Sequence, residues 1–360
     1  MAKSAVDVIG AAFEHTQAQL GKPFQFGQWA RLAVLGLATG EISSGGGCNS
    51  FRRLGDLPSK FPTHPQGFAD SGGGLPSLGL DLATLASIII VLLVGFLILG
   101  LVWVYVSSIS RFVLFESVLR KHCVLGAGWN RWQPQGLRFF GWQLGLAVVA
   151  LGVAALLFVP LLLPVLAAML KNQQPGPALL LAFLPMIFVF LAFGVVLALI
   201  AVLAKDFVVP LMAVENLGVM ESWSRLFRMM SADKLGYAGY IGMKIVLAIG
   251  ASVLFTILSV IVVVVLMVPL GIAGAVVVLL LKGAGLGWNA FTITAIIVAG
   301  TLLVAGLMYV IGLVNVPVAV FFPAYAMYFF AERYPALHAM VCPPPPAAPP
   351  PLPPAPAPIG

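Results

Sequence analysis

The chain has 360 residues, of which 61% are hydrophobic and only 9% are charged. A soluble globular domain is about 45–50% apolar and about 25% charged. So few charges cannot solvate the surface of a soluble protein, and the mean hydropathy of +1.07 indicates a chain that uses lipid as its solvent. This composition excludes a soluble enzyme, a secreted disulfide-linked module and a disordered protein.

The formal net charge of +7 is typical, in a membrane protein, of cytoplasmic segments that face anionic lipid. No nucleic-acid motif accompanies it, so we expect membrane lipids, among them anionic phospholipids, as partners and no nucleic acid. Cys48, Cys123 and Cys342 form no CxxC pair and have no histidine at ligand spacing. We therefore expect no disulfide framework, no metal and no cofactor.

Three segments of different character are predicted before the main hydrophobic region. Residues 1–23 form an amphipathic helix on the membrane surface, whose apolar face holds Val6, Ile9, Phe13 and Leu20. Residues 24–42 are the first possible span. They are few for a bilayer crossing, which needs about 20 apolar residues, and they include Arg31, so the alternatives are a full span, a re-entrant segment and a shallow one. Residues 43–79 are rich in Gly, Pro and Ser and indicate an outer loop.

The main transmembrane bundle is predicted over residues 80–335, with interfacial segments at 111–138 and 205–236. Residues 270–281 are too short to span alone and indicate an added turn or a re-entrant piece. Residues 336–360 are predicted to be a disordered, proline-rich cytoplasmic tail. With residues 24–42 the prediction is an all-α bundle of about six spans, the other five at 82–110, 139–170, 178–203, 237–268 and 288–330.

The distribution of basic residues predicts the orientation. Residues 111–138 carry five basic residues and residues 205–234 carry four, whereas the short connections on the other side carry only Lys171 and Lys282. Because basic segments stay in the cytoplasm, we expect both chain ends to be cytoplasmic. If residues 24–42 do not cross, the count falls to five and the N-terminus moves outside.

Two pairs of similar segments indicate an internal repeat at an offset of 94–95 residues. Arg111-Phe-Val-Leu resembles Asp206-Phe-Val-Val, and Trp129-Asn-Arg131 resembles Trp223-Ser-Arg225. The predicted unit is an interfacial helix followed by two spans, present three times. The alternative is that aromatic and basic residues recur at every membrane interface in any case.

Ionisable residues are the usual sign of a transport path or proton relay in a membrane, and they are nearly absent from the predicted spans. Residues 139–170, 178–204 and 245–281 hold none. This argues against an ion-coupled transporter and an intramembrane protease, and we predict a protein without enzymatic activity. Lys205 and Asp206, at the inner end of a span, are interpreted as a gate or a headgroup contact, or as a charge pair that extends to water.

Residues 219–230 are predicted to form an amphipathic helix at the inner interface, with Trp223 at headgroup level and Arg225 and Arg228 near lipid phosphates. The alternative is a plain anchoring helix. Glycines in GxxxG or similar spacing, at 141 and 145 and at 236, 239 and 242, favour close helix approach. The residues predicted to contact lipid or a partner are Trp223, Arg225, Arg228, Glu215, Glu221, Lys205, Asp206, Trp129 and Arg131.

Residues 207–250 combine F-x-x-P at Pro210, a Glu215-Asn216 turn with Gly218, and Trp223 with Arg225 ahead of an aromatic, Gly-rich span entry. This pattern resembles the membrane domain of the glycerophosphoryl diester phosphodiesterase family and related six-span bacterial inner-membrane proteins. The resemblance implies a bacterial cytoplasmic membrane protein of six helices. It implies no phosphodiesterase activity, which in that family belongs to a separate soluble domain.

Three functions are considered. The first is a non-enzymatic scaffold, assembly or lipid-homeostasis protein, alone or within a larger membrane complex. The second is an uncoupled permease or transporter of lipids or hydrophobic molecules. The third is an enzyme that acts on lipid at the inner interface through Glu215, Glu221, Arg225 and Arg228. The charge-free spans favour the first.

Overall fold

The computed structural model describes residues 4–21, 24–41, 82–170, 177–283 and 290–342, and every regular element in these ranges is helical. The loop expected at 43–79 lies outside the described residues. The order of the elements is α1 (Val8–Gly21), α2 (Phe26–Thr39), α4 (Leu82–Leu119), α5 (Leu125–Leu170), α6 (Pro177–Leu203), η3 (Ala204–Val208), α7 (Val209–Glu215), α8 (Val219–Ala232), α9 (Lys234–Gly283), α10 (Ala290–Val314), α11 (Val316–Ala331) and α12 (Pro335–Val341).

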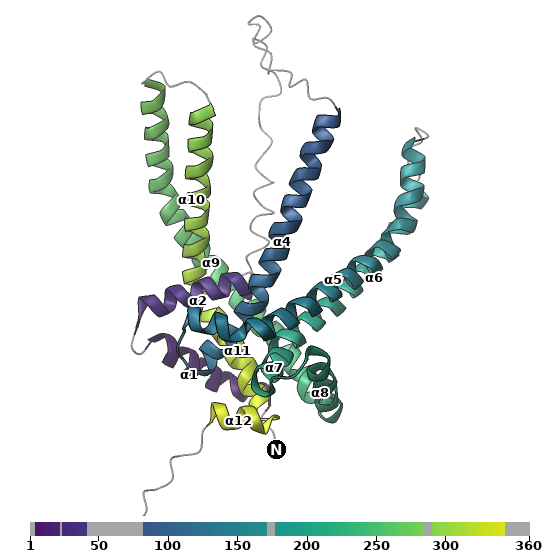
Figure 1. Cartoon of the computed structure of the whole chain (residues 1–360), viewed down its shortest axis with the longest axis vertical. Coiled ribbons are helices and arrows are strands. Elements are labelled where there is room, and N and C mark those ends of the chain that lie inside the picture. Colours follow the sequence, from purple (N-terminus) through teal and green to yellow (C-terminus); the bar gives the residue numbers. More distant parts are fainter. Residues whose placement is uncertain (1–3, 22–23, 42–81, 171–176, 284–289, 343–360) are drawn as a thin grey trace, which may run out of the picture.

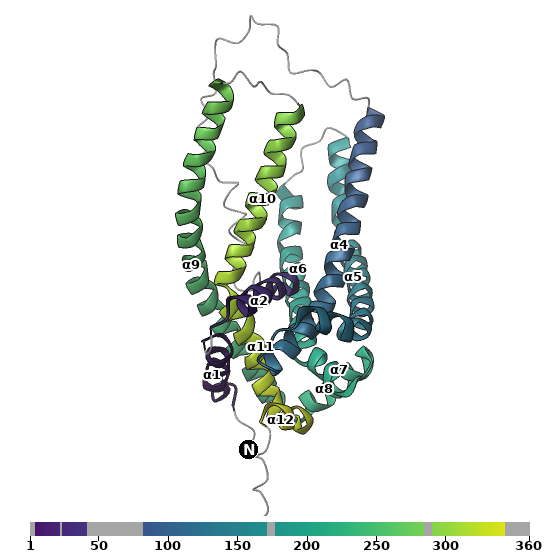
Figure 2. The same cartoon turned by 60° about the vertical axis from the view of Figure 1, so that its left-hand side comes forward.

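Long apolar helices rise from a packed base. In Figures 1 and 2, α4, the α5–α6 hairpin and the α9–α10 hairpin extend upward and separate from one another. We call the lower part the base; it consists of α1, α2, α7, α8, α11, α12 and the adjoining ends of the long helices. The buried hydrophobic core lies there, built from residues such as Ile109, Phe112, Phe207, Tyr240 and Phe329. The candidate functional site lies in this base.

Five described helices are long and apolar enough to cross a membrane: Ala86–Leu119, Leu125–Val159, Ile187–Glu215, Lys234–Leu280 and Thr292–Val314. The prediction of an all-α polytopic bundle is confirmed. The sixth span, predicted over residues 24–42, has no counterpart among these five helices. Helix α2 has 14 residues, or about 21 Å at 1.5 Å per residue, against a hydrocarbon core of about 30 Å, and it lies across the base (Figure 1).

Helix α1 lies at the end of the molecule that holds α12, as Figures 1 and 2 show. A polar clamp holds it there: the Nε2–H of His15 donates to the Val118 carbonyl at 2.8 Å, and the hydroxyl of Tyr328 on α11 lies 3.2 Å from Nδ1. Helix α1 packs against α11 and α4 in this way, and Val6 and Phe13, expected on its apolar face, are exposed.

Several predicted boundaries change. Residues 270–281 continue α9 through Pro269 rather than forming a separate piece. The last predicted span, 288–330, is divided at Asn315 into α10 and α11. The start of the predicted disordered tail forms α12, and residues 343–360 lie outside the described residues.

Close helix packing occurs at different glycines from those expected. A Cβ on Gly141, Gly145, Gly239 or Gly242 would meet nothing within 4 Å, and one on Gly236 would meet mainly its neighbour Asp233. At Gly136 of α5, by contrast, a Cβ would lie 2.6 Å from Cγ1 of Ile109 and 3.0 Å from its Cα. Here α4 and α5 cross at a distance that only glycine permits.

The backbone supports the predicted repeat for two of its three units. Lys121 ends the α4 segment with φ of 56°, and Asn216 ends the α7 segment with φ of 54°. Positive φ is uncommon for residues other than glycine, and these two positions are 95 residues apart, the offset predicted from the sequence. Each is followed by residues of an interfacial segment, the start of α5 in one unit and α8 in the other.

Candidate functional site: a buried charge cluster in the base

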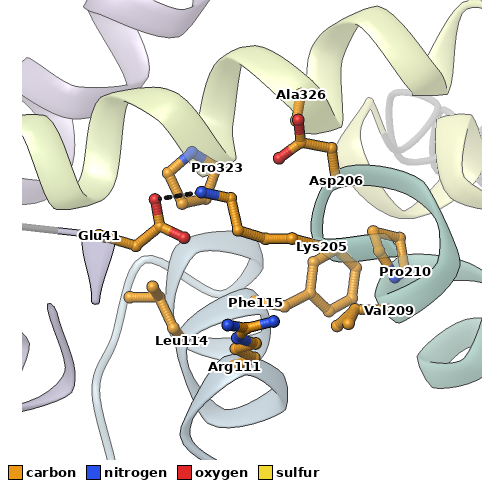
Figure 3. A pocket seen from close by; sticks show the side chains of 10 residues that line it. All are labelled: Glu41, Arg111, Leu114, Phe115, Lys205, Asp206, Val209, Pro210, Pro323 and Ala326. Carbon is orange, nitrogen blue, oxygen red and sulfur yellow. Dashed lines mark hydrogen bonds and ion pairs between the residues drawn. The ribbon is translucent and has the colours of Figure 1, made fainter. Parts of the chain in front are cut away.

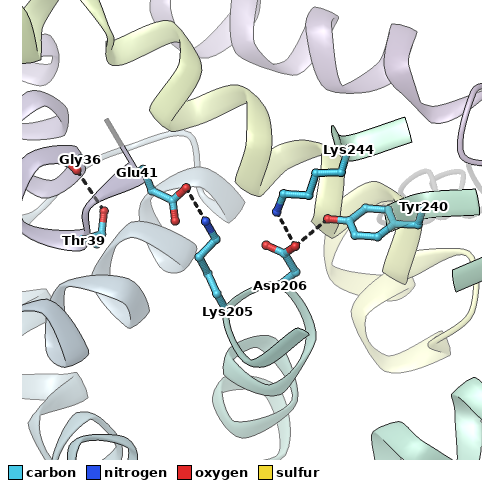
Figure 4. A network of polar contacts seen from close by, with 7 residues as sticks. All are labelled: Gly36, Thr39, Glu41, Lys205, Asp206, Tyr240 and Lys244. Atoms are coloured by element: carbon cyan, nitrogen blue, oxygen red, sulfur yellow. Dashed lines mark hydrogen bonds and ion pairs between the residues drawn. The ribbon is translucent and has the colours of Figure 1, made fainter. Parts of the chain in front are cut away.

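A π-helical turn, η3, creates the site. Proline at position 210 has no N–H and its ring would collide with the carbonyl of residue 206 in an ordinary α-helix. The chain widens by one residue, so that the Val209 N–H donates to the Ala204 carbonyl, five residues back. Such π turns are frequent at functional sites. The turn places Lys205 and Asp206 at the centre of the base, where they point to different helices (Figure 4).

Lys205 and Asp206 join α2 to α9. The Nζ of Lys205 lies 2.8 Å from Oε2 of Glu41, directly after α2. Asp206 forms an ion pair with Lys244 of α9, and the Tyr240 hydroxyl donates to its Oδ2 at 2.9 Å. Asp206 is only 4% exposed, so the predicted charge pair that extends to water is wrong. The two residues are bound by partners on other helices instead.

Arg111 of α4 completes the cluster. It lines a small cavity with Glu41, Lys205 and Asp206 (Figure 3). Its guanidinium carbon lies 5.8 Å from the centre of the Phe139 ring, and its buried Nε has no hydrogen-bond partner in the described part of the chain. With Lys244, the five ionisable side chains comprise three cations and two anions, a formal net charge of +1. We call these five residues the charge cluster.

Aromatic rings enclose one side of the cluster. The rings of Tyr240 and Tyr325 stack with centroids 5.1 Å apart, and Phe329 lies 4.6 Å from Tyr240. Phe207, adjacent to Asp206 in sequence, lies edge-on to Tyr240 at 5.1 Å. Apolar surroundings strengthen attraction between opposite charges and raise the cost of leaving one unpaired. The pairing in the cluster is therefore strongly specified.

Glu41 is the member of the cluster that lies outside the spanning segments. Burial alone raises the pKa of a carboxyl group, but the nearby cations Lys205 and Lys244 and the hydrogen bond from Lys205 outweigh it, so the pKa of Glu41 falls below its ordinary value. Glu41 is thus held ionised. The ion pair with Lys205 connects the N-terminal helices to η3 at neutral pH.

The cavity beside the cluster has a volume of about 30 Å³, which is the space of roughly one water molecule. No substrate fits there. Among the described residues no three His, Cys, Asp or Glu side chains gather as a metal site would require. The geometry is that of an electrostatic clamp between α2, α4, η3 and α9, not that of a substrate pocket.

Glu215 and Arg225, two of the predicted contact residues, are brought together in a second, smaller group. They form an ion pair, and the hydroxyl of Tyr334 donates to Glu215. Trp223 is 8% exposed and packs between Trp142 of α5 and Phe227. Its ring therefore has little surface left for lipid.

The remaining predicted residues lie apart from both groups. Glu221 and Arg228 are exposed on α8. At the start of α5, Trp129 packs edge-on against Tyr105, and Arg131 pairs with Glu116 at 3.0 Å. The lipid contacts expected of these residues stay predictions.

Sequence reasoning found Lys205 and Asp206 but missed Glu41, Arg111 and Lys244 as their partners. Each missed residue is the charged residue nearest to the end of an apolar run: Glu41 after α2, Arg111 in α4 and Lys244 in α9. That position was the available signal. The pairing itself had no sequence signal, because Lys205 and Glu41 are 164 positions apart.

Fold and cluster together define a multi-pass α-helical membrane protein whose spans are joined by a packed, charged base. Residues 3–340 match the model of a family of unknown function, DUF7544. The chain belongs to this family. No curated protein and no solved structure matches this chain.

Proposed function

We propose that this protein is a non-enzymatic membrane scaffold: the base fixes three separate sets of spanning helices, and their exposed sides receive other membrane components. One observation carries the proposal. In the most apolar 18-residue stretches of α4, α5 and α9, no residue is buried. Residues 88–102 of α4 are exposed on all sides.

Separated spans have a physical consequence. In a bilayer, helices associate through van der Waals packing and hydrogen bonds, since lipid tails are as apolar as leucine. A helix with no protein neighbour has all of its packing surface available to lipid or to another protein. The charge cluster holds the lower ends of α4, η3 and α9 together, so their upper parts can remain separate.

The basic residues support a cytoplasmic base. Arg111, Arg120, Arg131, Lys205 and Arg225 all belong to it, and basic residues accumulate on the cytoplasmic side of membrane proteins. In a bacterial cell, as the resemblance to six-span bacterial proteins implies, the membrane would be the cytoplasmic one. A reporter fused after α12 that is active only in the cytoplasm tests this orientation.

Photo-crosslinking tests the scaffold. A photoreactive phenylalanine analogue replaces Phe96, which is 73% exposed in α4, and, as a matched control, Phe112, which is fully buried in the same helix. In native membranes we expect Phe96 to crosslink to a second protein and Phe112 only to this chain. Crosslinks from Phe96 to its own α5, α6, α9 or α10 would show that the spans close into a bundle and would refute the proposal.

A second candidate is an uncoupled transporter of lipids or hydrophobic molecules. The specific observation in its favour is the lateral separation of the upper part of α4 from the two hairpins (Figure 1), which leaves lipid-facing surface on every side. Crosslinks from Phe96 to lipid alone, together with lipid transfer between vesicles by the purified protein, would favour this candidate over the scaffold. The cavity of about 30 Å³ at the cluster does not provide a route for a solute.

A further inference from the structure

A second, larger cavity lies at the elbow, residues 120–124, which joins α4 to α5. Its volume is about 220 Å³, and its polar lining consists of Glu116, Ser117, Arg120, His122 and Arg131. We call it the elbow pocket. It shares no lining residue with the cavity at the charge cluster.

The wall of the pocket is fixed by the N-terminal helices. The last carbonyls of a helix lack intrahelical partners, and side chains of α1 and α2 donate to one such carbonyl of α4 and to two carbonyls of the elbow. Gln19 donates to the Ser117 carbonyl at 3.1 Å, Gln28 to the Lys121 carbonyl at 3.1 Å and Arg31 to the Cys123 carbonyl at 3.2 Å. The pocket is thus part of a hydrogen-bonded structure and not a gap in a loose turn.

The charges favour an anion. The carboxylate of Glu116 already accepts from Arg131 at 3.0 Å and from the indole N–H of Trp132, and it forms an ion pair with Arg120 at 3.1 Å. It has little capacity left to bind a cation. Each arginine has five N–H donors and a side chain that is 58% exposed, so both retain donors for an incoming group. With one acid and two arginines, the pocket carries a formal charge of +1 before His122 is counted.

The start of α5 forms another wall of the pocket. Val124, Ala127 and Gly128 line it, and a helix start favours negative charge, although the Gly128 N–H itself donates to the Val124 carbonyl at 3.1 Å. A side chain at position 128 would enter this wall, because a Cβ there would lie 3.1 Å from Cγ1 of Val113. Two arginine forks beside a helix start are a combination that recognises phosphate.

The volume limits the ligand. Pockets for drug-sized molecules measure about 300–1,000 Å³, so a dinucleotide or a nucleoside triphosphate is too large, whereas a phosphate with a small attached group fits. The elbow directly follows the span Ala86–Leu119 and directly precedes the span Leu125–Val159. It therefore lies at a membrane face, where phosphate groups of lipids are abundant.

We propose that the elbow pocket binds a phosphate monoester or diester through Arg120 and Arg131, either as a lipid headgroup or as a soluble phosphate compound. This inference goes beyond the proposed function, since a scaffold or a transporter could each carry such a site. Its failure would leave the crosslinking test of the scaffold untouched.

Calorimetric titration of the full-length protein in neutral detergent tests the site with two probes, inorganic phosphate and dihexanoyl phosphatidic acid. We expect saturable binding that weakens at least tenfold in the double variant Arg120→Ala/Arg131→Ala. The matched control is Arg138→Ala, which removes an exposed arginine of α5 outside the pocket lining and should change the affinity less than twofold. The double variant Arg120→Lys/Arg131→Lys keeps the charge and the pairing with Glu116, and we expect it to weaken binding three- to tenfold because lysine lacks the planar fork.

Each outcome decides something. Tighter binding of phosphatidic acid than of inorganic phosphate supports a headgroup site, and equal binding of the two supports a soluble phosphate. Absence of saturable binding for both probes overturns the proposal, as does an equal loss in Arg138→Ala, which would reduce the effect to overall charge. If the double alanine variant does not fold, the lysine variant alone decides between these outcomes.

Discussion

The charge cluster predicts a large loss of stability on substitution of Asp206 by asparagine. Asp206 binds Lys244 and Tyr240, and the change leaves three cations facing Glu41 alone. Removing one partner of a buried ion pair costs about 3–5 kcal/mol, and we expect the free energy of unfolding to fall by an amount in this range. Replacing both partners, as Asp206→Leu/Lys244→Met, leaves no unpaired charge between them and should cost much less than the single change.

The assay is unfolding of the purified protein in mixed micelles with increasing dodecyl sulfate, followed by circular dichroism. The matched control is Asp233→Asn, because the Asp233 side chain also pairs with a basic residue, Arg333, at 2.8 Å but is 41% exposed. Exposed ion pairs contribute about 0–1 kcal/mol, and asparagine keeps the cap on the Gly236 N–H. Equal losses for Asp206→Asn and Asp233→Asn, or a double variant as unstable as the single one, would refute the reasoning.

Three further predictions concern the crossing of α4 and α5, the buried His15, and the placement of α1 and α12. Gly136→Ala forces a Cβ against Ile109 and should lower the free energy of unfolding by about 1–3 kcal/mol in the same assay. Gly141→Ala has open space at its Cβ and should be neutral or stabilising by up to about 1 kcal/mol. Equal effects of the two changes would contradict the close crossing of α4 and α5. Burial, with the nearby charge of Lys121, lowers the pKa of His15 despite its bond to the Val118 carbonyl, so the unfolded chain binds the proton more readily. Stability should therefore fall as the pH drops below about 6.5. Unfolding curves measured at several pH values should lose this dependence in His15→Gln. An unchanged dependence in the variant would show that His15 is not its source. In a variant without native cysteines, Gln17→Cys and His338→Cys should react with a membrane-impermeant maleimide from the same side, since α1 and α12 share one end of the molecule; labelling from opposite sides would contradict the fold.

The spans could be predicted from the sequence because lipid accepts only apolar side chains on every side of an exposed helix. Residues 88–102 of α4 illustrate this, being apolar or glycine throughout and exposed on all sides. The surroundings of α2 could not be predicted in the same way. Its residues are apolar because Leu32, Ala33 and Leu35 are buried in the base, and hydropathy does not distinguish burial in protein from burial in lipid.

The face that a base helix buries was also beyond sequence reasoning. In α8 the structure buries Trp223 and Leu226 but leaves the neighbouring apolar residue Phe227 58% exposed. In α1 the polar residues His15 and Gln19 are buried and the apolar Phe13 is exposed. Polar side chains enter the core here because the end of α4 offers carbonyl acceptors, and the position of that end depends on contacts distant in sequence.

By itself the sequence determined that this chain is a membrane protein of long apolar helices and where each apolar run ends in charge. These properties depend on composition and on residues close together in the chain. Only the tertiary structure decided that α2 is a helix of 14 residues packed across the base, that Lys205 binds Glu41 while Asp206 binds Lys244, and that Arg120 and Arg131 meet on Glu116 beside a cavity. Each of these facts joins charged groups on different helices or across a turn, and the direction in which a charge points is settled by packing rather than by hydropathy.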